Sequence, residues 1–403
     1  MHRVVITGAG AVSSLGADLS SNFKSLSEGK SGISKIEFLN SDRLSIKIGG
    51  QIKNYNPDIH FTKQEKSIYD KFTQFALIAT KQAVLSSGWE FQKNDNSDIG
   101  VILGTAGGGL QTQDENYRQV YEEGKNRVHP LIVPKLMNNA AASNVSIKFN
   151  VQGPSFTIAS ACSSSNHAMG QAFNLIRSGV IKAAITGGSE SMLCFGGIKA
   201  WEGLRIMSKE ACRPFCKNRD GMVQGEGAAI FIFENYHDAK KRGANILAEV
   251  AGFSMTSDAI DIVNPSKKGA ARAMIGALKD AKFNPEDVEY INAHGTGTLA
   301  NDKTECAAIK EVFKSHANKL MISSTKSMHG HLIGGTGAVE LLGCLLALNK
   351  QIIAPTINFI KKDPDCDLDI VPNIARQKNV KCVISNSFAF GGTNAVIALK
   401  KGP

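Results

Sequence analysis

One cysteine stands where a predicted strand gives way to a predicted helix, within a run of small residues. Cys162 follows the segment 151–158, which is a turn and then a β-prone run, and apolar residues recur after it at helical spacing from Ala168 to Ile176. A helix N-terminus has N–H groups without intrahelical partners and carries the positive end of the helix dipole, and both stabilise a thiolate. The position therefore indicates a nucleophile. The alternative is a small buried hydrophobe, the usual state of a free cysteine.

Three further polar side chains, His294, Lys326 and His331, stand at similar junctions between predicted strands, loops and helices. Each also has a structural interpretation, because a histidine beside glycines often completes a turn and a lysine at a helix start is usually solvated. Together with Cys162 they supply one nucleophile, two imidazoles and one ammonium. This set suits covalent acyl transfer, in which the sulfur holds an acyl group and imidazole N–H donors hold a carbonyl oxygen as charge builds on it.

Two other enzyme classes share parts of this pattern. A papain-type hydrolase separates its cysteine and histidine by about 130–150 residues, and here the separation is 294 − 162 = 132. Its cysteine, however, lies near the mature N-terminus in a Cys-Gly-x-Cys-Trp-like setting, which Cys162 lacks. A short-chain dehydrogenase also begins with a strand and Thr-Gly-x-Gly, as at 7–10, but the pairs Tyr121/Lys125 and Tyr236/Lys240 lack the serine that the family needs about a dozen residues earlier.

The elements that must position these residues alternate between strands and helices, which predicts a mostly parallel sheet covered on both faces, with function at the strand C-termini. Residues 8–16 are predicted to form a turn, and 380–399 resembles 183–188 plus 225–234, which suggests a duplicated α/β unit. The predicted strands are 3–7, 98–104, 182–188, 225–234, 246–253, 288–294, 319–324, 380–388 and 391–399. The predicted helices are 63–87, 168–177, 237–243, 269–281, 302–313, 334–347 and one within 127–150.

Composition narrows the class of protein further. The chain has 403 residues, 42% hydrophobic and 20% charged, which is typical of a globular protein of two domains or one duplicated domain. No apolar run approaches the ~18 residues of a membrane span, and residues 1–8 enter a strand at once, so we expect no signal peptide. Eight irregularly spaced cysteines favour a reducing, cytoplasmic setting, and no metal site is expected. The net charge of +10 favours an acidic partner, but the scattered cations do not indicate nucleic acid.

Ordered motifs occur over nearly the whole length of the chain. They are Val4-Val5-Ile6-Thr7-Gly8, Gly153-Pro154-Ser155, Ala161-Cys162-Ser163, Arg213-Pro214-Phe215, Arg219-Asp220-Gly221-Met222-Val223-Gln224-Gly225-Glu226-Gly227, Asn292-Ala293-His294-Gly295-Thr296-Gly297-Thr298, Ser324-Thr325-Lys326-Ser327, Gly330-His331 and Asn386-Ser387-Phe388-Ala389-Phe390-Gly391-Gly392-Thr393-Asn394. In these motifs the chain resembles the β-ketoacyl-(acyl-carrier-protein) synthases, in the KAS I/II branch of the thiolase-fold condensing enzymes. The resemblance implies a thiolase fold, with duplicated α-β-α-β-α halves and mixed, mostly parallel sheets. Residues 1–245 would carry the cysteine and 246–403 the histidines.

The resemblance implies a decarboxylative condensation in fatty-acid biosynthesis. Cys162 would take an acyl chain from an acyl carrier protein, and His294 and His331 would hold the malonyl thioester carbonyl while carbon dioxide leaves. The carbanion would attack the acyl-cysteine, with the backbone N–H groups of Cys162 and Phe390 as the oxyanion hole. Lys326 would order the histidines.

Further residues take roles from the same resemblance. Glu340 matches the carboxylate behind the lysine, and Asp302 matches its usual companion. Phe390 matches a gating phenylalanine. The substrate-binding candidates are Thr296, Thr298, Gly107, Trp201 and Phe388.

The implied partner is an acyl carrier protein, which fits the positive charge of the chain. It would deliver acyl and malonyl thioesters on its own 4'-phosphopantetheine arm, so no covalently bound cofactor is expected, and the enzyme would be a homodimer. The candidate docking cations are Lys63, Lys66, Lys71, Arg127, Lys135 and Arg205.

Two departures from the common members stand out. The run Ser163-Ser164-Ser165-Asn166-His167 is closer to nodulation-type synthases and to those that make very long or unusual acyl chains. Gly107 stands where many KAS II enzymes place a bulky residue across the acyl tunnel. Either the pocket is enlarged for a long or atypical primer, or another residue, for example one from a dimer partner, refills the space.

Three other relatives of this fold remain as alternatives. A non-catalytic partner such as a chain-length factor typically loses the cysteine, which is retained here. A polyketide-type ketosynthase would keep the same residues. A degradative thiolase uses a second cysteine near its C-terminal glycine motif, where this chain has Phe388-Ala389-Phe390, and Cys382 is expected in the core.

Overall fold

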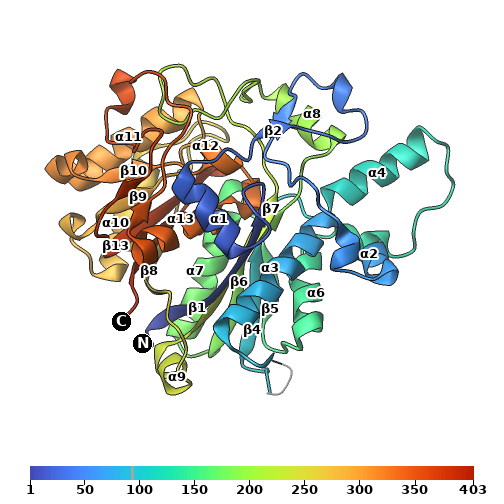
Figure 1. Ribbon diagram of the computed structural model, residues 1–403, viewed down its shortest axis with the longest axis horizontal. Helices are drawn as coiled ribbons and strands as arrows, with labels where there is room; N and C mark the ends of the chain where they lie inside the picture. Colours follow the sequence, from blue (N-terminus) through green and yellow to red (C-terminus); the bar gives the residue numbers. More distant parts are fainter. Residues whose placement is uncertain (92–94) are drawn as a thin grey trace.

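The computed structural model describes residues 1–91 and 95–403. One continuous sheet runs through the molecule in the order β10-β9-β13-β14-β8-β1-β7-β6-β4-β5 (Figure 1). Its strands are β1 (Val4–Ser13), β4 (Ile99–Gly104), β5 (Ser155–Ile158), β6 (Ala183–Glu190), β7 (Gly227–Asn235), β8 (Ala248–Ser257), β9 (Tyr290–Asn292), β10 (Met321–Ser323), β13 (Cys382–Ala389) and β14 (Thr393–Lys401). Two short ribbons pair β2 (Ser34–Lys35) with β3 (Ile48–Gly49), and β11 (Ile352–Ile353) with β12 (Arg376–Gln377).

The strand order repeats about the centre of the sheet. Reading outward, β1-β7-β6-β4-β5 corresponds to β8-β14-β13-β9-β10, with the same sequence of antiparallel and parallel pairings in each half. The predicted duplication is therefore confirmed. The sheet is mixed, as expected, but parallel pairs do not predominate. Within the described sheet, five of nine pairings are antiparallel, because β7 and β14 each return beside the strand before them in chain order and β1 pairs with β8.

Helices complete a five-layered arrangement (Figure 1). In the middle, α7 (Ser164–Arg177) and α13 (Thr336–Lys350) contact strands of both halves. On the outer faces, α3 (Lys71–Ser87) and α6 (Ala140–Phe149) cover the first half, and α10 (Lys267–Ala281) with α11 (Leu299–Phe313) covers the second. The other helices are α1 (Leu19–Glu28), α2 (Lys63–Ile68), α4 (Leu110–Tyr121), α5 (Ile132–Leu136), α8 (Phe195–Gly203), α9 (Tyr236–Lys241) and α12 (Lys326–His329).

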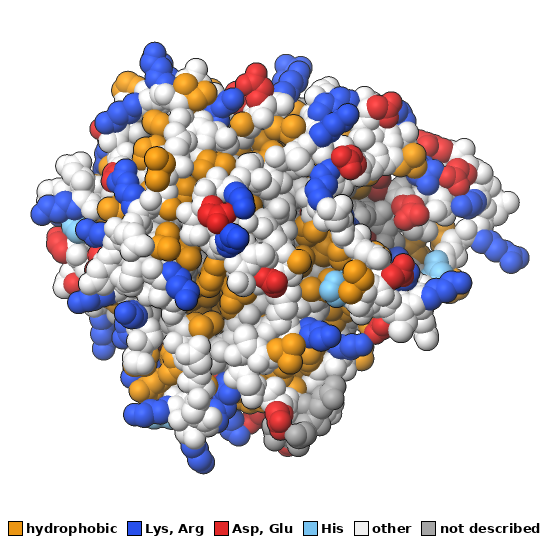
Figure 2. All heavy atoms as spheres, in the orientation of Figure 1, with side chains coloured by type: hydrophobic (Ala, Val, Ile, Leu, Met, Phe, Trp, Pro, Cys, Tyr) orange, Lys and Arg blue, Asp and Glu red, His pale blue; other side chains and the backbone are white. Residues whose placement is uncertain are grey.

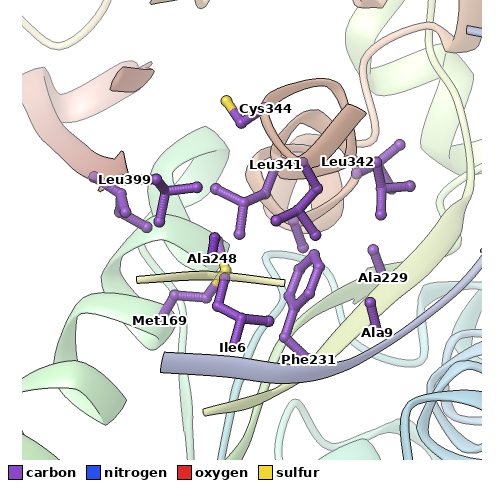
Figure 3. Close-up of a cluster of buried hydrophobic side chains, with 14 of the residues drawn as sticks. Ile6, Ala9, Met169, Ala229, Phe231, Ala248, Leu341, Leu342, Cys344 and Leu399 are labelled. Atoms are coloured by element: carbon purple, nitrogen blue, oxygen red, sulfur yellow. The ribbon is translucent and has the colours of Figure 1, made fainter. Parts of the chain in front are cut away.

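The largest buried cluster lies between the middle helices and the centre of the sheet. Figure 3 shows Leu341 of α13 above Ile6 and Phe231 of the central strands, with Met169 of α7 beside them. The helix α13 is buried on all sides, because both sheet halves pack on it. Burial of this kind is the main stabilising contribution to the fold.

Two local predictions were wrong. Residues 8–13 continue β1 instead of forming a turn, and the glycines there permit close approach of α3. A Cβ on Gly10 would lie 2.1 Å from the Ala79 carbonyl oxygen, and one on Gly8 would lie 2.2 Å from that of Ala83. The predicted helix 63–87 is divided into α2 and α3, because Asp70 leaves the helix and caps α3 through its bond from the Phe72 N–H.

The parallel strands bring the candidate residues together at the C-terminal ends of the strands. The strands β9, β10 and β13 run in the same direction and are followed by His294, Lys326 and Phe390. In the other half, β5 is followed by Cys162, beside the parallel strands β4 and β6. Function at strand C-termini was the prediction for such a sheet. Within the described residues, no helix combines the length and apolar character needed to cross a membrane.

Candidate active site

Cys162 lies in a tight turn between β5 and α7. The turn is a 3-10 segment, Ala161–Ser163, and Ala161 has a φ of 49°, a left-handed conformation that is uncommon for a side-chain-bearing residue. Neighbouring serines hold it: Ser164 Oγ donates to the Ala161 carbonyl at 2.7 Å and accepts from the Ser160 N–H at 2.9 Å. The Cys162 side chain is buried, and α7 begins two residues later.

The polar run after the cysteine connects this turn to the second half of the chain. Ser163 Oγ lies 3.2 Å from Thr393 Oγ1 and donates to the Ser160 carbonyl at 2.8 Å. Ser165 donates to the Gly334 carbonyl, and Asn166 Nδ2 to that of Ser385 at 3.3 Å. His167 Nδ1 lies 2.7 Å from Ser160 Oγ. The unusual run therefore serves to fix the cysteine turn against the loops that carry the histidines and Phe390.

Lys326 fixes the protonation pattern of His294. Its ammonium lies 3.3 Å from His294 Nδ1 and donates to the His294 carbonyl at 2.5 Å. An ammonium has only donors, so Nδ1 must accept, and neutral His294 carries its proton on Nε2. Burial and the charge of Lys326 hold the pKa of His294 well below 6.5, so the neutral form is the stable one at neutral pH.

His331 is also neutral, with its proton on Nε2, but different partners hold it in that form. The Ile333 N–H donates to His331 Nδ1 at 2.9 Å, and Thr336 Oγ1 lies 2.9 Å from the same nitrogen. Its proton therefore also stands on Nε2. Burial, with Lys326 and His329, holds the pKa of His331 well below 6.5. The two rings meet edge to face, with centroids 5.5 Å apart.

The structure thus brings Cys162, His294 and His331 together from both halves of the chain. The cysteine sulfur and one ring nitrogen of each histidine lie within 4.8 Å of one another. Two neutral imidazoles that present N–H donors beside a sulfur can hold a carbonyl oxygen on which negative charge develops.

The expected thiolate is not supported by the position of Cys162. Burial raises the pKa of its thiol to about 12, although Lys326 and the backbone N–H groups of Phe390 and Cys162 act in the opposite direction. The dipole at the start of α7 was the basis of that prediction, and desolvation outweighs it. Cys162 therefore rests as the neutral thiol.

Behind the histidines lies a buried ion pair between Lys326 and Glu340. Both side chains have no exposed area. Burial raises the pKa of Glu340, and the ammonium of Lys326 opposes that rise. Glu340 therefore stands where the resemblance implied.

Asp302 does not join this pair. It accepts from the N–H groups of Phe215 at 2.7 Å and Gly297 at 3.2 Å, and lies 3.8 Å from the Arg219 guanidinium. The carboxylate that holds the His294 loop is Glu305, which accepts from the N–H groups of His294 and Gly295, each at 2.8 Å. Glu305 could not be predicted as a site residue from the sequence, because a glutamate on a helix eleven residues after the histidine has no distinguishing pattern.

A cavity of about 260 Å³ leads from the surface to Cys162 and the two histidines. Phe390 and Trp201 stack at its wall, with ring centroids 5.9 Å apart. The hydroxyls of Thr296 and Thr298 lie 2.8 Å apart on another side. These residues and Phe388 all line the cavity, as their assignment to substrate binding requires.

The loop that carries Phe390 is held from outside by the segment 258–264. The Gly391 N–H donates to the Ile262 carbonyl, and the Asp258 N–H donates to the Gly392 carbonyl, each at 2.8 Å. Exposed apolar side chains surround this entrance: Leu204, Ile260, Ile262, Val263 and Leu299.

Gly107 lies outside the cavity, beside Met192. A Cβ on Gly107 would lie 3.0 Å from Met192 Cε and 3.2 Å from its Sδ. The missing side chain therefore leaves no open space, because a residue of the same chain fills it. The Gly107 loop is held by the buried carboxylate of Glu190, which accepts from the N–H groups of Ala106, Gly107 and Gly334. Glu190 likewise has no pattern in the sequence that predicts this role.

The six candidate docking cations differ in their surroundings. Lys71 bonds both oxygens of buried Glu226, at 2.7 and 2.9 Å, and is therefore a structural residue. Lys66 pairs with Asp58. Arg205 is exposed at the mouth of the cavity, where it has no ion-pair partner among the described residues. Lys63 and Arg127 are exposed and Lys135 half-buried, and none of the three lines the cavity. Figure 2 shows Lys and Arg side chains dispersed among acidic groups over the face of the molecule that is in view.

Comparison with known proteins gives consistent matches over the chain. Residues 1–239 match the family described as Beta-ketoacyl synthase, N-terminal domain, and residues 247–360 match its C-terminal domain. Nodulation protein E of Rhizobium sp. (strain N33) is 41% identical over 400 residues, 99% of each chain. The 3-oxoacyl-[acyl-carrier-protein] synthase 2 of Staphylococcus aureus (strain COL) is 40% identical over 406 residues, 99% of this chain and 98% of that one. A solved type II PKS ketosynthase in complex with its acyl-carrier protein superposes with a TM-score of 0.90, at 31% identity and 100% coverage of both chains.

The charge of Lys326 sets a testable pH dependence. We expect His294 and His331 to stay neutral as the pH falls through 6.5, and the Lys326→Met variant to protonate both at a higher pH than the wild type, because an ammonium that lowers their pKa is lost. NMR titration of labelled histidines measures this, and His60, which lies outside the site, should titrate identically in both proteins. A second variant, Lys326→Met/Glu340→Gln, removes the Lys326 charge without leaving the Glu340 carboxylate buried and unpaired. Unchanged titration of both histidines in the two variants would contradict the assignment.

Proposed function

Because the chain belongs to the β-ketoacyl synthase family, as its motifs predict, and is a condensing acyltransferase of the β-ketoacyl-(acyl-carrier-protein) synthase type, we propose that Cys162 carries the growing acyl chain. The first step is a thiol–thioester exchange. The sulfur of Cys162 bonds to the acyl carbon, the bond to the carrier's thiol breaks, and the proton of Cys162 ends on that thiol. This exchange starts from a thiol, which is the resting state that burial favours.

In the second step malonyl thioester replaces the departed arm. Its carboxylate leaves as carbon dioxide, and the electron pair moves into an enolate whose oxygen accepts from the Nε2–H groups of His294 and His331. The enolate carbon attacks the acyl carbon, and the N–H groups of Cys162 and Phe390 hold the resulting oxyanion. Collapse forms the β-ketoacyl product and expels the sulfur of Cys162, which takes up one proton. The mutual distance of 4.8 Å or less among the sulfur and ring nitrogens is the observation that carries this proposal.

The proposed partner is an acyl carrier protein that docks at the entrance beside Arg205. The net charge of +10 favours an acidic partner, and the related ketosynthase of known structure is in complex with its acyl-carrier protein. Arg205 stands beside the apolar rim of the cavity and is the docking cation that we favour among the six. The partner's phosphopantetheine arm would pass Thr296 and Thr298.

We further propose that two copies of the chain associate through the β5 edge. This strand ends the sheet, so one side of its backbone is unpaired, and Phe156 on it is 37% exposed. Further exposed apolar side chains lie on α6, which packs on β5, on and beside α5, and on α4, which projects from the body (Figure 1). They are Tyr117, Tyr121, Leu131, Val133, Met137 and Ile147. A concentration of this kind on a free monomer marks an interface.

The roles of the histidines are separated by measuring the two half-reactions. We expect His294→Ala and His331→Ala each to retain acylation of Cys162 by acyl carrier protein, but to lower the rate of carbon dioxide release from malonyl carrier protein by about 10²–10³, the usual loss for one oxyanion donor. His60→Gln is the matched control, since that ring is exposed, lies beside Tyr55 and is outside the site. Loss of acylation together with unchanged decarboxylation would contradict the assignment.

Charge reversal tests the docking site. We expect Arg205→Glu to raise the KM for acyl carrier protein several-fold at low salt, with an effect that shrinks as salt screens the interaction. Lys241→Glu, an exposed cation on α9, is the control for a change in net charge alone. Equal KM values for the two variants would remove Arg205 from the docking site.

The assembly is tested by sedimentation of the wild type and of Phe156→Asp. We expect a wild-type mass of twice 43.1 kDa and a variant shifted toward the monomer, because a charge on the edge strand opposes its pairing. A monomeric wild type would contradict the proposed interface.

A further inference from the structure

An acyl chain on Cys162 needs space that the cavity does not provide. The cavity lies on the side of the histidines, Thr296 and Phe390, and this is the path that the carrier's arm must use. On its other side Cys162 belongs to a packed apolar cluster that includes Leu193, Ile198 and Ile333. The chain must therefore enter this cluster by displacing a side chain.

Met192 is the side chain of this cluster best suited to move. It packs against the cluster from a half-buried position, and its Cγ, Sδ and Cε occupy the space that a side chain on Gly107 would take. Methionine is unbranched and has three rotatable side-chain bonds, so it adopts new conformations at low cost.

The surroundings of Met192 are held more firmly. Ile198 is fully buried, and Leu193 and Ile333 are each 2% exposed. The backbone of the Gly107 loop is tied by Glu190, which also bonds the Gly334 N–H in the loop after His331. The wall is therefore fixed, and Met192 is the adjustable part of it.

We propose that Met192 is the residue that sets acyl-chain length in this enzyme, by closing against Gly107 when the pocket is empty and turning away when an acyl chain occupies it. The inference rests on the proposed function, since it requires that Cys162 carry the chain. The space available to the substrate depends on the combined volume of the side chains at positions 107 and 192. A larger side chain at one position can therefore be compensated by a smaller one at the other.

The experiment compares Cys162 acylation and condensation across carrier-linked acyl chains that differ by two carbons, in four proteins and a control. Met192→Ala should shift the preferred chain longer by at least one two-carbon step. Gly107→Ile should shift it shorter, because the added side chain meets Met192. Met192→Ala/Gly107→Ile should return the preference to within one step of the wild type. Met255→Ala, an exposed methionine on β8, should leave profile and rate unchanged.

The outcomes separate this inference from the proposed function. A wild type that no acyl carrier protein acylates at Cys162 would contradict the function itself. A wild type that is acylated, with Met192→Ala showing an unchanged profile, would overturn only the role of Met192. A double variant that behaves like Gly107→Ile would also overturn it, because the two side chains would then act on separate spaces. Melting temperatures of all five proteins exclude a loss of folding as the cause.

Discussion

The buried ion pair between Lys326 and Glu340 is the constraint on which the site depends. Neither side chain has exposed area, and breaking such a pair by removing one partner costs about 3–5 kcal/mol because the other charge is left buried and unpaired. The ammonium also faces His294 Nδ1 and binds the His294 carbonyl. One group therefore fixes the orientation of a ring, the nitrogen that carries its proton, and its neutrality. A neutral donor is what a developing enolate oxygen needs, because an imidazolium would lose its proton to it.

The duplicated sheet explains how two distant segments meet at this pair. Each half presents the C-terminal ends of parallel strands at the same edge, and α7 and α13 pack between the halves. The cysteine comes from the first half, and the histidines, lysine and Phe390 come from the second. Side chains that follow Cys162 then join the halves: Ser163 and Ser165 bond Thr393 and Gly334, and Asn166 bonds the strand at Ser385. These contacts fix the turn that carries Cys162 against the second half of the chain.

Much of this arrangement could be predicted from the sequence, where the determinant was local. Spacing and residue type predict the alternation of strands and helices and the similar end of each half. They also predict the set of site residues, Cys162, His294, Lys326 and His331. The predictions that were wrong have a common physical cause. Each depended on a residue that is distant in the sequence and packs against the residue concerned. The glycines of β1 serve contact with α3, Gly107 is complemented by Met192, and the pKa of Cys162 follows burial more than the helix dipole. Glu305 and Glu190 act through backbone groups that no sequence pattern marks.

The most direct test of the central claim is mass spectrometry of Cys162 through one catalytic cycle. The intact wild type is incubated with an acyl carrier protein that bears an acyl chain, then with malonyl carrier protein. The account predicts an acyl adduct on the peptide that contains Cys162, followed by its disappearance as β-ketoacyl carrier protein and carbon dioxide form in equal amounts, and no adduct in Cys162→Ala. Formation of the β-ketoacyl product without an adduct on Cys162 would contradict the account.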